Sequence, residues 1–263
     1  MKDIKIVFMG TPVFSVPLLE ALIEKYNVIG VVCQPDRDKD KIPPVKAKAL
    51  EKNILVFQPE NIRNDYQAIL SLKPDIIITC AYGQIIPKAI LDAPRYGCVN
   101  VHASLLPKLR GGAPIHHAIM RGDSKTGITI MYMTEKMDAG DIISQREEVI
   151  LPTDNVGTLH DRLSLLGRDL MLETLPDIIS GNINPIRQKE SEASFAPNIK
   201  REDEHIDFNK SKREVYNKIR ALNPWPGAYC ILEAKVLKVW NSRIGENTYF
   251  SNFNGEIVKL YDD

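Results

Sequence analysis

The 263-residue chain has no net charge and no long hydrophobic run, and each absence excludes a class of protein. Its 34 basic and 34 acidic residues balance, so any contact with nucleic acid has to come from a local patch. No segment approaches the roughly 18 consecutive apolar residues of a membrane-spanning helix. The apolar run that ends at Met9 is too short for a signal peptide. These absences predict a soluble, cytoplasmic protein with no membrane contact.

Several enzyme signatures are also missing. The first strand-to-helix turn, Gly10-Thr11-Pro12, has one glycine where a dinucleotide-binding turn shows Gly-x-Gly-x-x-Gly, which disfavours a nicotinamide-dependent dehydrogenase. There is no Gly-x-Ser-x-Gly turn for a nucleophile, and the adjacent His116 and His117 lack metal-ligand spacing. These absences point to direct transfer between two bound substrates, without metal or covalent intermediate. The four cysteines form no Cys-x-x-Cys pair, which favours buried, reduced thiols: Cys33, Cys80, Cys98 and Cys230.

What the chain does contain is a series of short apolar runs that alternate with helical segments. Four runs are typical of strands, at residues 4–9, 28–33, 76–83 and 98–102, and a helix at 16–25 follows the first. Strands that are apolar on both faces indicate a parallel sheet covered by helices on both sides. We therefore expect a Rossmann-like, doubly wound α/β fold with a mostly parallel sheet, whose ligands bind beyond the carboxyl ends of the strands.

Two further strands and a long helix complete the predicted first domain, residues 1–182. The strands cover residues 127–133 and 141–151. The helix is capped by Asp154 or Asn155, runs to residue 179 and ends at Gly181. Leucines at every third or fourth position mark its buried stripe. His160 lies in its first turns, where we expect a surface histidine.

Residues 183–203 change character, because they are polar, contain proline and lack periodicity, and we interpret them as a connection. A second, smaller domain at 204–263 then holds a helix at 211–221 and short strands at 228–232, 236–240 and 256–260. Short strands split by turns suggest an OB-like β-barrel. A closed barrel needs more chain than remains, so we interpret this domain as truncated.

Three polar residues near the centre of the chain have no evident packing role: Asn100, His102 and Asp138. Asn100 and His102 alternate on an otherwise apolar strand, so their side chains leave the same face. If the strand at 127–133 is its neighbour, the turn after it brings Asp138 beside His102. An amide donor, a titratable base and an orienting carboxylate suit chemistry at a carbonyl. Taken singly, each also has a plainer explanation: a strand-end amide, a core histidine and a turn-capping aspartate.

Two loops are open to a structural or a functional interpretation. Residues 34–48 mix basic and acidic side chains, which suits either a solvated loop or a basic flap for a phosphate backbone. The exposed leucines of Ser104-Leu105-Leu106-Pro107 suit either loop packing or the wall of an apolar slot for a flat ring. The run Tyr82-Gly83-Gln84-Ile85, at the end of the third strand, is expected close to that slot.

The sequence around the triplet resembles the folate-dependent formyltransferases. The resemblance is carried by N-V-H-A-S-L-L-P-K-L-R-G-G-A-P-I-H, which starts at Asn100, and by the later M-D-A-G-D. The marks F-M-G-T-P-V-F-S, Q-P-D-R, A-Y-G-Q-I-I-P and N-P-W-P-G extend it over nearly the whole chain and favour members that act on initiator methionyl-tRNA. The resemblance implies 10-formyltetrahydrofolate as the formyl donor and no metal.

The resemblance also implies a role for each matching residue. The catalytic triplet of the family falls on Asn100, His102 and Asp138. The amine then attacks the formyl carbon, Asn100 and protonated His102 stabilise the oxyanion, and Asp138 keeps His102 charged and helps to remove the amine proton. The implied folate contacts are Tyr82, Gly83, Gln84, Ile85, Ser104, Leu105, Leu106, Pro107, Gly140 and Asp141. The implied contacts to methionyl-tRNA, on a chain that acts as a monomer, are Phe14, Arg37, Lys39 and Lys41.

Two departures from the family pattern bear on tRNA binding. The basic loop after Q-P-D-R is several residues shorter, with Lys39 and Lys41 as partial stand-ins. The second domain stops soon after G-E-I-V-K-L, so we expect a shortened chain or missing residues. Two rival functions stay open: a formyltransferase for another amine, such as glycinamide ribonucleotide or an amino sugar nucleotide, and a non-catalytic RNA-binding protein.

Overall fold

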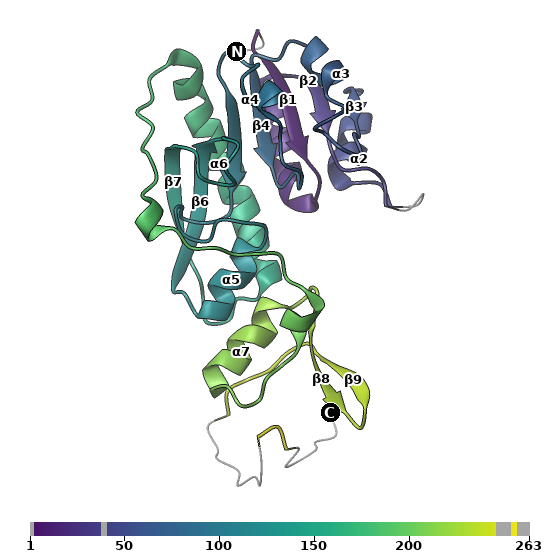
Figure 1. Cartoon of the computed structure of the whole chain (residues 1–263), viewed down its shortest axis with the longest axis vertical. Coiled ribbons are helices and arrows are strands. Elements are labelled where there is room, and N and C mark those ends of the chain that lie inside the picture. The colour runs from purple at the N-terminus through teal and green to yellow at the C-terminus, as the bar shows by residue number, and fades with distance from the viewer. Residues whose placement is uncertain (1–2, 38–40, 246–253, 257–263) are drawn as a thin grey trace.

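The computed structural model describes residues 3–37, 41–245 and 254–256. A seven-stranded sheet in the order β3-β2-β1-β4-β5-β6-β7 forms its centre (Figure 1). Neighbouring strands are parallel from β3 to β5, whereas β6 runs antiparallel to both β5 and β7. The predicted mostly parallel, Rossmann-like sheet is therefore confirmed. Its strands are β1 (Lys5–Gly10), β2 (Asn27–Val32), β3 (Val56–Phe57), β4 (Ile76–Cys80), β5 (Cys98–His102), β6 (Lys125–Tyr132) and β7 (Ile142–Val149).

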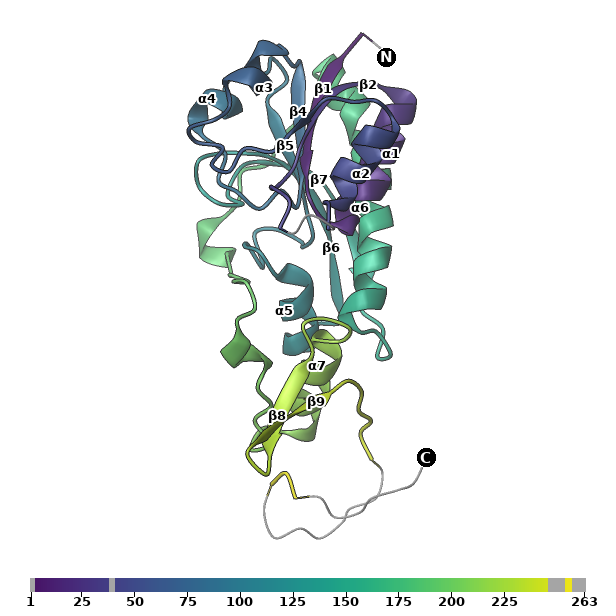
Figure 2. The same cartoon turned by 90° about the vertical axis from the view of Figure 1, so that its right-hand side faces the viewer.

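Helices cover both faces of the sheet around β1, and the alternation of its side chains shows why. Ile6 and Phe8 pack into a core with α1 (Val16–Lys25), α2 (Pro44–Glu51) and α6 (Val156–Ser180). Val7 and Met9 pack into a second core on the opposite face. That face is covered by α3 (Gln67–Ser71) and α4 (Lys88–Leu91), as Figure 2 shows. A strand that is apolar at every position is buried on both faces.

At β5 the two faces of the sheet differ, and this difference creates room for the site. Val99 and Val101 belong to the core beneath α6. Asn100 and His102 alternate with them and therefore face the other way. On that other face the sheet is covered by irregular chain, because Leu106 packs with Met131 and Ile142 of the sheet. The polar face of β5 thus lies beneath loops, which can shape a binding surface more freely than a helix.

The long helix α6 begins and ends as predicted but does not leave its histidine at the surface. The side chain of Asn155 accepts a hydrogen bond from the backbone N–H of Thr158, and Gly181 ends the helix with a left-handed φ of 75°. The His160 ring lies 5.2 Å from the rings of both Phe14 and Trp225, and its side chain is 13% exposed. The prediction of a surface histidine is wrong, because the Asn-Pro-Trp-Pro-Gly turn packs over this end of the helix. Among the described residues no helix is long and apolar enough to cross a membrane.

The segment predicted to be a connection also pairs with the sheet and its loops. Ile186 exchanges two backbone hydrogen bonds of 2.8 Å with Ile142 at the edge of the sheet. Further along, Phe195 forms a parallel bridge with Arg110. The segment also contains η2 (Glu190–Glu192) and descends across the front of β6 and β7 in Figure 1. We call residues 183–196 the strap, because they cross the loop-covered face of the sheet.

The C-terminal part is a helix and an antiparallel ribbon. After η3 (Arg201–Glu204), α7 (Lys212–Ala221) packs against α5 (Pro114–Arg121). The ribbon pairs β8 (Ala228–Leu232) with β9 (Lys235–Val239). The strand expected at 256–260 lies outside the described residues apart from Glu256, so the described ribbon has two strands and not the five of a barrel.

Candidate active site

The structure brings His102 and Asp138 together, by a different route from the one predicted. Because β6 is antiparallel to β5, Tyr132 at its end lies opposite Val99 and not beside His102, which pairs with Thr129. The chain after β6 instead folds back over the face of the sheet. The result is a distance of 3.7 Å between His102 Nδ1 and Asp138 Oδ2.

A glycine and a left-handed residue make that fold-back possible. Asp138 adopts a φ of 47°, a conformation that costs a non-glycine residue about 1–2 kcal/mol. Two residues later, a Cβ at Gly140 would lie 1.8 Å from the carbonyl oxygen of Tyr132, so no side chain fits there. The Met-Asp-Ala-Gly-Asp motif is therefore a tight turn that points its aspartate back at β5.

His102 is buried and held by one edge of its ring. Its Nε2 lies 3.0 Å from the carbonyl oxygen of Leu109, and since a carbonyl only accepts, Nε2 carries the proton and donates it. The other nitrogen, Nδ1, is the edge that faces Asp138. The separation from the carboxylate is longer than a hydrogen bond. Nδ1 is thus the ring nitrogen that remains for a reacting molecule.

Asp138 is fixed by the same loop that holds His102. Its Oδ2 accepts a hydrogen bond of 2.8 Å from the backbone N–H of Gly111. Leu109, the acceptor for His102, lies two residues earlier. The loop at 107–113 therefore sets the position of the imidazole and the carboxylate relative to each other.

Asn100 is oriented by a residue that is absent from the predicted site, Thr79. The Thr79 hydroxyl donates to Asn100 Oδ1 at 2.7 Å, so the oxygen of the amide is turned toward β4. The two N–H bonds of the amide then point away from Thr79 and can donate to a substrate oxygen. A threonine between apolar residues in Ile-Ile-Ile-Thr-Cys was the available signal, and it carries no motif of its own.

The leucines predicted to be exposed are packed. Leu106 is only 3% exposed and lies in a small core with Met131 and Ile142. A methyl group of Leu105 lies over Gly127 of β6. Ser104 donates from its hydroxyl to the carbonyl of Lys108. Leu106 is therefore packed and not exposed as expected, and the contacts of Leu105 and Leu106 with folate stay predictions.

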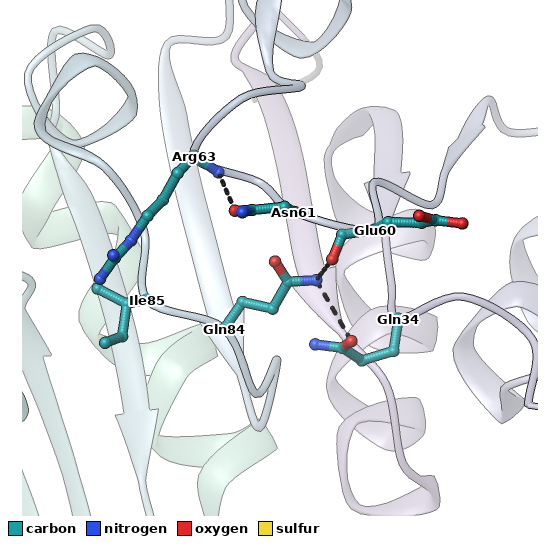
Figure 3. Close-up of a pocket in the computed structure, with 6 residues that line it drawn as sticks. All are labelled: Gln34, Glu60, Asn61, Arg63, Gln84 and Ile85. Carbon is teal, nitrogen blue, oxygen red and sulfur yellow. Dashed lines mark hydrogen bonds between the residues drawn. The ribbon is translucent and has the colours of Figure 1, made fainter.

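The predicted residues after β4 are divided between the interior and a shallow pocket. Tyr82 is buried, and burial raises the pKa of its hydroxyl. Gln84 and Ile85 line a pocket of about 340 Å³ (Figure 3). The amide of Gln84 is largely used within the fold, because its Oε1 accepts from the backbone N–H of Ile62 and its Nε2 donates to Pro59. The remaining lining residues were not predicted: Gln34, Glu60, Asn61 and Arg63.

None of the triplet lines that pocket, so it does not define the reacting centre. Asn100, His102 and Asp138, which join amide donors to a titratable pair, are the candidate reacting centre. The loops that follow β1, β2 and β4 meet beside the pocket, since Thr11 Oγ1 and Gln34 Nε2 both donate to the carbonyl of Tyr82. Among the described residues no cluster of histidine, cysteine and acidic side chains could hold a metal ion.

The predicted tRNA contacts that the structure describes differ in exposure. Phe14 is buried against His160 and Arg37 is exposed, as is Lys41, while Lys39 lies outside the described residues. Part of the expected basic loop is helix α2, whose Lys46 pairs with Asp36. Lys48 likewise contacts Glu20 and Glu51. For Lys46 and Lys48 the loop assignment is wrong, because Pro44 starts a helix.

Comparisons with known proteins agree with this fold. The family model for formyl transferase matches residues 4–175, and the model for the formyl transferase C-terminal domain matches residues 198–263. The chain belongs to the formyl transferase family.

Curated relatives with high identity share one name. The methionyl-tRNA formyltransferase of Bacillus velezensis is 60% identical over 90% of this chain and 78% of its own length. The enzyme of the same name from Bacillus subtilis is 58% identical over 91% of this chain and 78% of its own length.

Solved structures of lower identity share the fold. A 4-N formyltransferase from Francisella tularensis superposes with a TM-score of 0.75 at 20% identity, covering 94% of this chain and all of that one. An N-formyltransferase from Helicobacter canadensis, in complex with folinic acid and dTDP-3-aminofucose, gives a TM-score of 0.74 at 20% identity, covering 97% of this chain and 93% of that one.

Proposed function

We propose that this chain transfers a formyl group from 10-formyltetrahydrofolate to the amine of initiator methionyl-tRNA. The observation that carries the proposal is the distance of 3.7 Å between His102 Nδ1 and Asp138 Oδ2. On the same strand as His102, the side-chain oxygen of Asn100 already accepts a hydrogen bond from Thr79. Relatives of 58–60% identity named methionyl-tRNA formyltransferase support the choice of acceptor.

Asn100 stabilises the negative charge that forms on the formyl oxygen. Attack by the amine nitrogen on the formyl carbon converts the carbonyl into an oxyanion, which needs donors already in place. Thr79 holds the oxygen of the Asn100 amide, so the amide N–H groups are directed outward before the substrate binds. One such donor is typically worth about 10²–10³ in rate.

His102 and Asp138 move the protons. The attacking amine has to lose a proton, and Asp138 accepts it while the 3.7 Å gap leaves His102 Nδ1 free to face the substrate. Asp138 passes that proton to His102 Nδ1, which delivers it to the folate nitrogen as the bond between the formyl carbon and that nitrogen breaks. Because Nε2 is engaged by Leu109, Nδ1 alone performs this step. The products are N-formylmethionyl-tRNA and tetrahydrofolate.

The donor is proposed to lie across the loop-covered face next to the triplet. The backbone after β4, from Gly83 to Ile85, and the turn from Asp138 to Asp141 offer peptide groups for a flat polar ring. Gly83, with its φ of 90°, keeps the first of these loops free of a side chain. The packed Leu105 and Leu106 act beneath this surface and support it. Phe14, Arg37 and Lys41 remain proposed contacts of the acceptor.

The acceptor is tested by measuring formyl incorporation into initiator methionyl-tRNA and into two small amines, glycinamide ribonucleotide and an amino sugar nucleotide. We expect transfer to the tRNA with kcat/KM at least about 10³-fold above either small amine, the discrimination that a site gains by binding a large substrate through remote contacts. Transfer to a small amine alone would overturn the choice of acceptor. Transfer to none of the three would remove the proposed reaction as well.

A further inference from the structure

A buried polar network joins the strap to the catalytic turn. Arg110 is fully buried, and a buried guanidinium needs partners for its N–H groups. Its Nε and Nη2 donate to Gln188 Oε1 at 3.1 and 2.8 Å. Its Nη1 donates to both oxygens of Glu190, at 3.1 and 3.2 Å. The strap therefore supplies both acceptors of this arginine.

The two bonds from Arg110 fix which way the amide of Gln188 faces. With the oxygen turned to the guanidinium, the nitrogen Nε2 faces the catalytic turn and donates to the carbonyls of Asp138 and Gly140, at 2.8 and 2.7 Å. The side chain is 6% exposed, and both N–H bonds of its amide are used. Gln188 thus holds the two backbone carbonyls that bracket the turn.

The network of Arg110, Gln188 and Glu190 also contacts the residues that precede the turn. Lys136, two residues before Asp138, contacts Glu190 at 2.8 Å. Hydrogen bonds from Arg110 and then from Lys136 lower the pKa of the Glu190 carboxyl to about 2, so it stays charged. The carboxylate therefore links the buried guanidinium to the start of the turn.

The strap also positions the loop at 107–113, which holds the side chains of His102 and Asp138. Arg110 N donates to the carbonyl of Ser194, and Ala196 N donates back to the carbonyl of Arg110. A Cβ at Gly111 would lie 2.6 Å from the Ala196 carbonyl oxygen, so the strap packs directly on the peptide that donates to Asp138. The strap thus contacts both the turn that carries Asp138 and the loop at 107–113, which fix the His102–Asp138 pair.

We infer that Gln188 is a positioning residue for Asp138, held in its working orientation by buried Arg110, and that the strap belongs to the catalytic unit. The inference rests on the proposed role of Asp138 in formyl transfer. Asp138 sits in a left-handed conformation that it leaves readily without support. Loss of the two Gln188 bonds lets the turn relax and moves the carboxylate away from His102 Nδ1.

The sharpest variant is Gln188→Glu. A carboxylate keeps the shape of the side chain and still accepts from Arg110, but it has no N–H to donate to the two carbonyls. We expect kcat to fall by about 10–100-fold, because misplacing a reacting group by roughly 1 Å costs that much, with KM for the acceptor within about two-fold. A fall in kcat with intact KM separates loss of positioning from loss of fold or binding.

A double-mutant cycle with Asp138→Asn tests whether Gln188 acts through Asp138. We expect Gln188→Glu to slow the Asp138→Asn background by less than about two-fold, because the group that it positions is already gone. All rates are measured with whichever acceptor amine the wild-type chain formylates, so the result does not depend on the acceptor. A full additional loss in the double variant, or wild-type kcat in Gln188→Glu, would overturn the inference.

A second pair of variants keeps the test decisive if Gln188→Glu does not fold. Glu190→Gln weakens the grip on Arg110 and Lys136, and we expect kcat to fall by about three-fold without a change in KM. Glu192→Gln, in the same short helix, removes only a contact to Lys189 and serves as the matched control. Equal kcat values for the two variants would count against the strap as part of the catalytic unit.

Discussion

Two pairs of neighbouring strands in this molecule bury their apolar residues to very different degrees. β5 and β6 lie inside the seven-stranded sheet, where Val99, Val101 and Ile130 are almost completely buried. β8 and β9 form a ribbon of their own, and Val236 at 54% and Leu237 at 45% remain exposed. β5, β8 and β9 have five residues each, so what differs is the presence of a covering layer among the described residues.

The difference explains why we propose the catalytic site on the first pair. A side chain can hold a carboxylate or an imidazole at a fixed distance only if its own strand and loops are fixed. β5 offers that, since Thr79 on one side and the loop at 107–113 on the other orient Asn100 and His102. The described part of the ribbon has an apolar, partly open surface, and its Lys238 pairs with Glu204. Four experiments test this difference.

The largest effect is expected for His102→Ala. Removing the ring deletes the Nδ1 proton donor, and kcat should fall by about 10²–10⁴-fold, the usual contribution of a positioned acid or base. Binding of methionyl-tRNA should be nearly unchanged, because a large substrate is held mainly by contacts remote from the reacting centre. The measurement is steady-state formylation alongside a tRNA binding titration. A kcat within about three-fold of wild type would remove His102 from the mechanism.

Two identical substitutions then compare the sheet with the ribbon in stability. Leu163→Ala on α6 removes a side chain with no exposed surface and should cost about 2–5 kcal/mol of unfolding free energy. Leu237→Ala on β9 removes a side chain that is already 45% exposed and should cost less than about 0.5 kcal/mol. Urea unfolding of both variants measures the difference. Equal costs would mean that the ribbon is as well covered as the sheet.

A histidine where the two regions meet should make stability depend on pH. His116 on α5 contacts the backbone of Trp225, and burial first of all lowers its pKa from 6.5 to about 4. Its folded-state pKa is below the unfolded one, so between these values only the unfolded chain binds the proton. Stability is therefore complete above pH 6.5 and falls as the pH drops toward 4, by about 3 kcal/mol at most.

The substitution His116→Gln removes the imidazole that binds this proton in the unfolded chain. Unfolding free energies of wild type and variant, measured near neutral pH and again in mild acid, should differ in their pH dependence by most of that amount. Parallel curves for the two proteins would show that His116 is already protonated in the fold or is not buried. The measurement therefore shows whether His116 is buried and uncharged where α5 contacts the Trp225 backbone.

The smallest effect is expected for Thr79→Val, which frees the oxygen of Asn100. The amide can then turn, and kcat should fall by about 3–10-fold, the value of one neutral hydrogen bond. Thr126→Val is the matched control, because this buried hydroxyl on β6 has no hydrogen-bond partner in the described structure and its loss should leave kcat unchanged. If the two variants behave alike, Thr79 does not orient Asn100.

Strands β1, β2 and β4 to β7 and helices α1 and α6 could be predicted because their signals are local. The boundaries of β5 and of α1 agree with the prediction, since the residues that decide them are neighbours in the sequence. The identities of Asn100, His102 and Asp138 were also available, because polar side chains on an apolar strand are unusual. Their meeting depended on β5 and β6 being neighbours, which is confirmed.

The features that could not be predicted depend on contacts between residues far apart in the sequence. Gln188 lies in a polar, aperiodic stretch, and only its contact with Arg110, 78 residues away, gives it a role. His160 looked exposed because the turn that covers it, at Trp225, comes 65 positions later by residue number. Leu106 looked like a slot wall because burial by Met131 and Ile142 cannot be read from a loop sequence. Long-range packing decided each of these cases.

The central claim is that the His102–Asp138 pair carries formyl transfer, and Asp138→Asn tests it most directly. The amide keeps the shape of the turn and can still accept from the Gly111 N–H, but it cannot take up a proton. In a single-turnover reaction with 10-formyltetrahydrofolate and methionyl-tRNA, we expect the transfer step to slow by about 10²–10³-fold. A variant that transfers formyl at the wild-type rate would contradict the account.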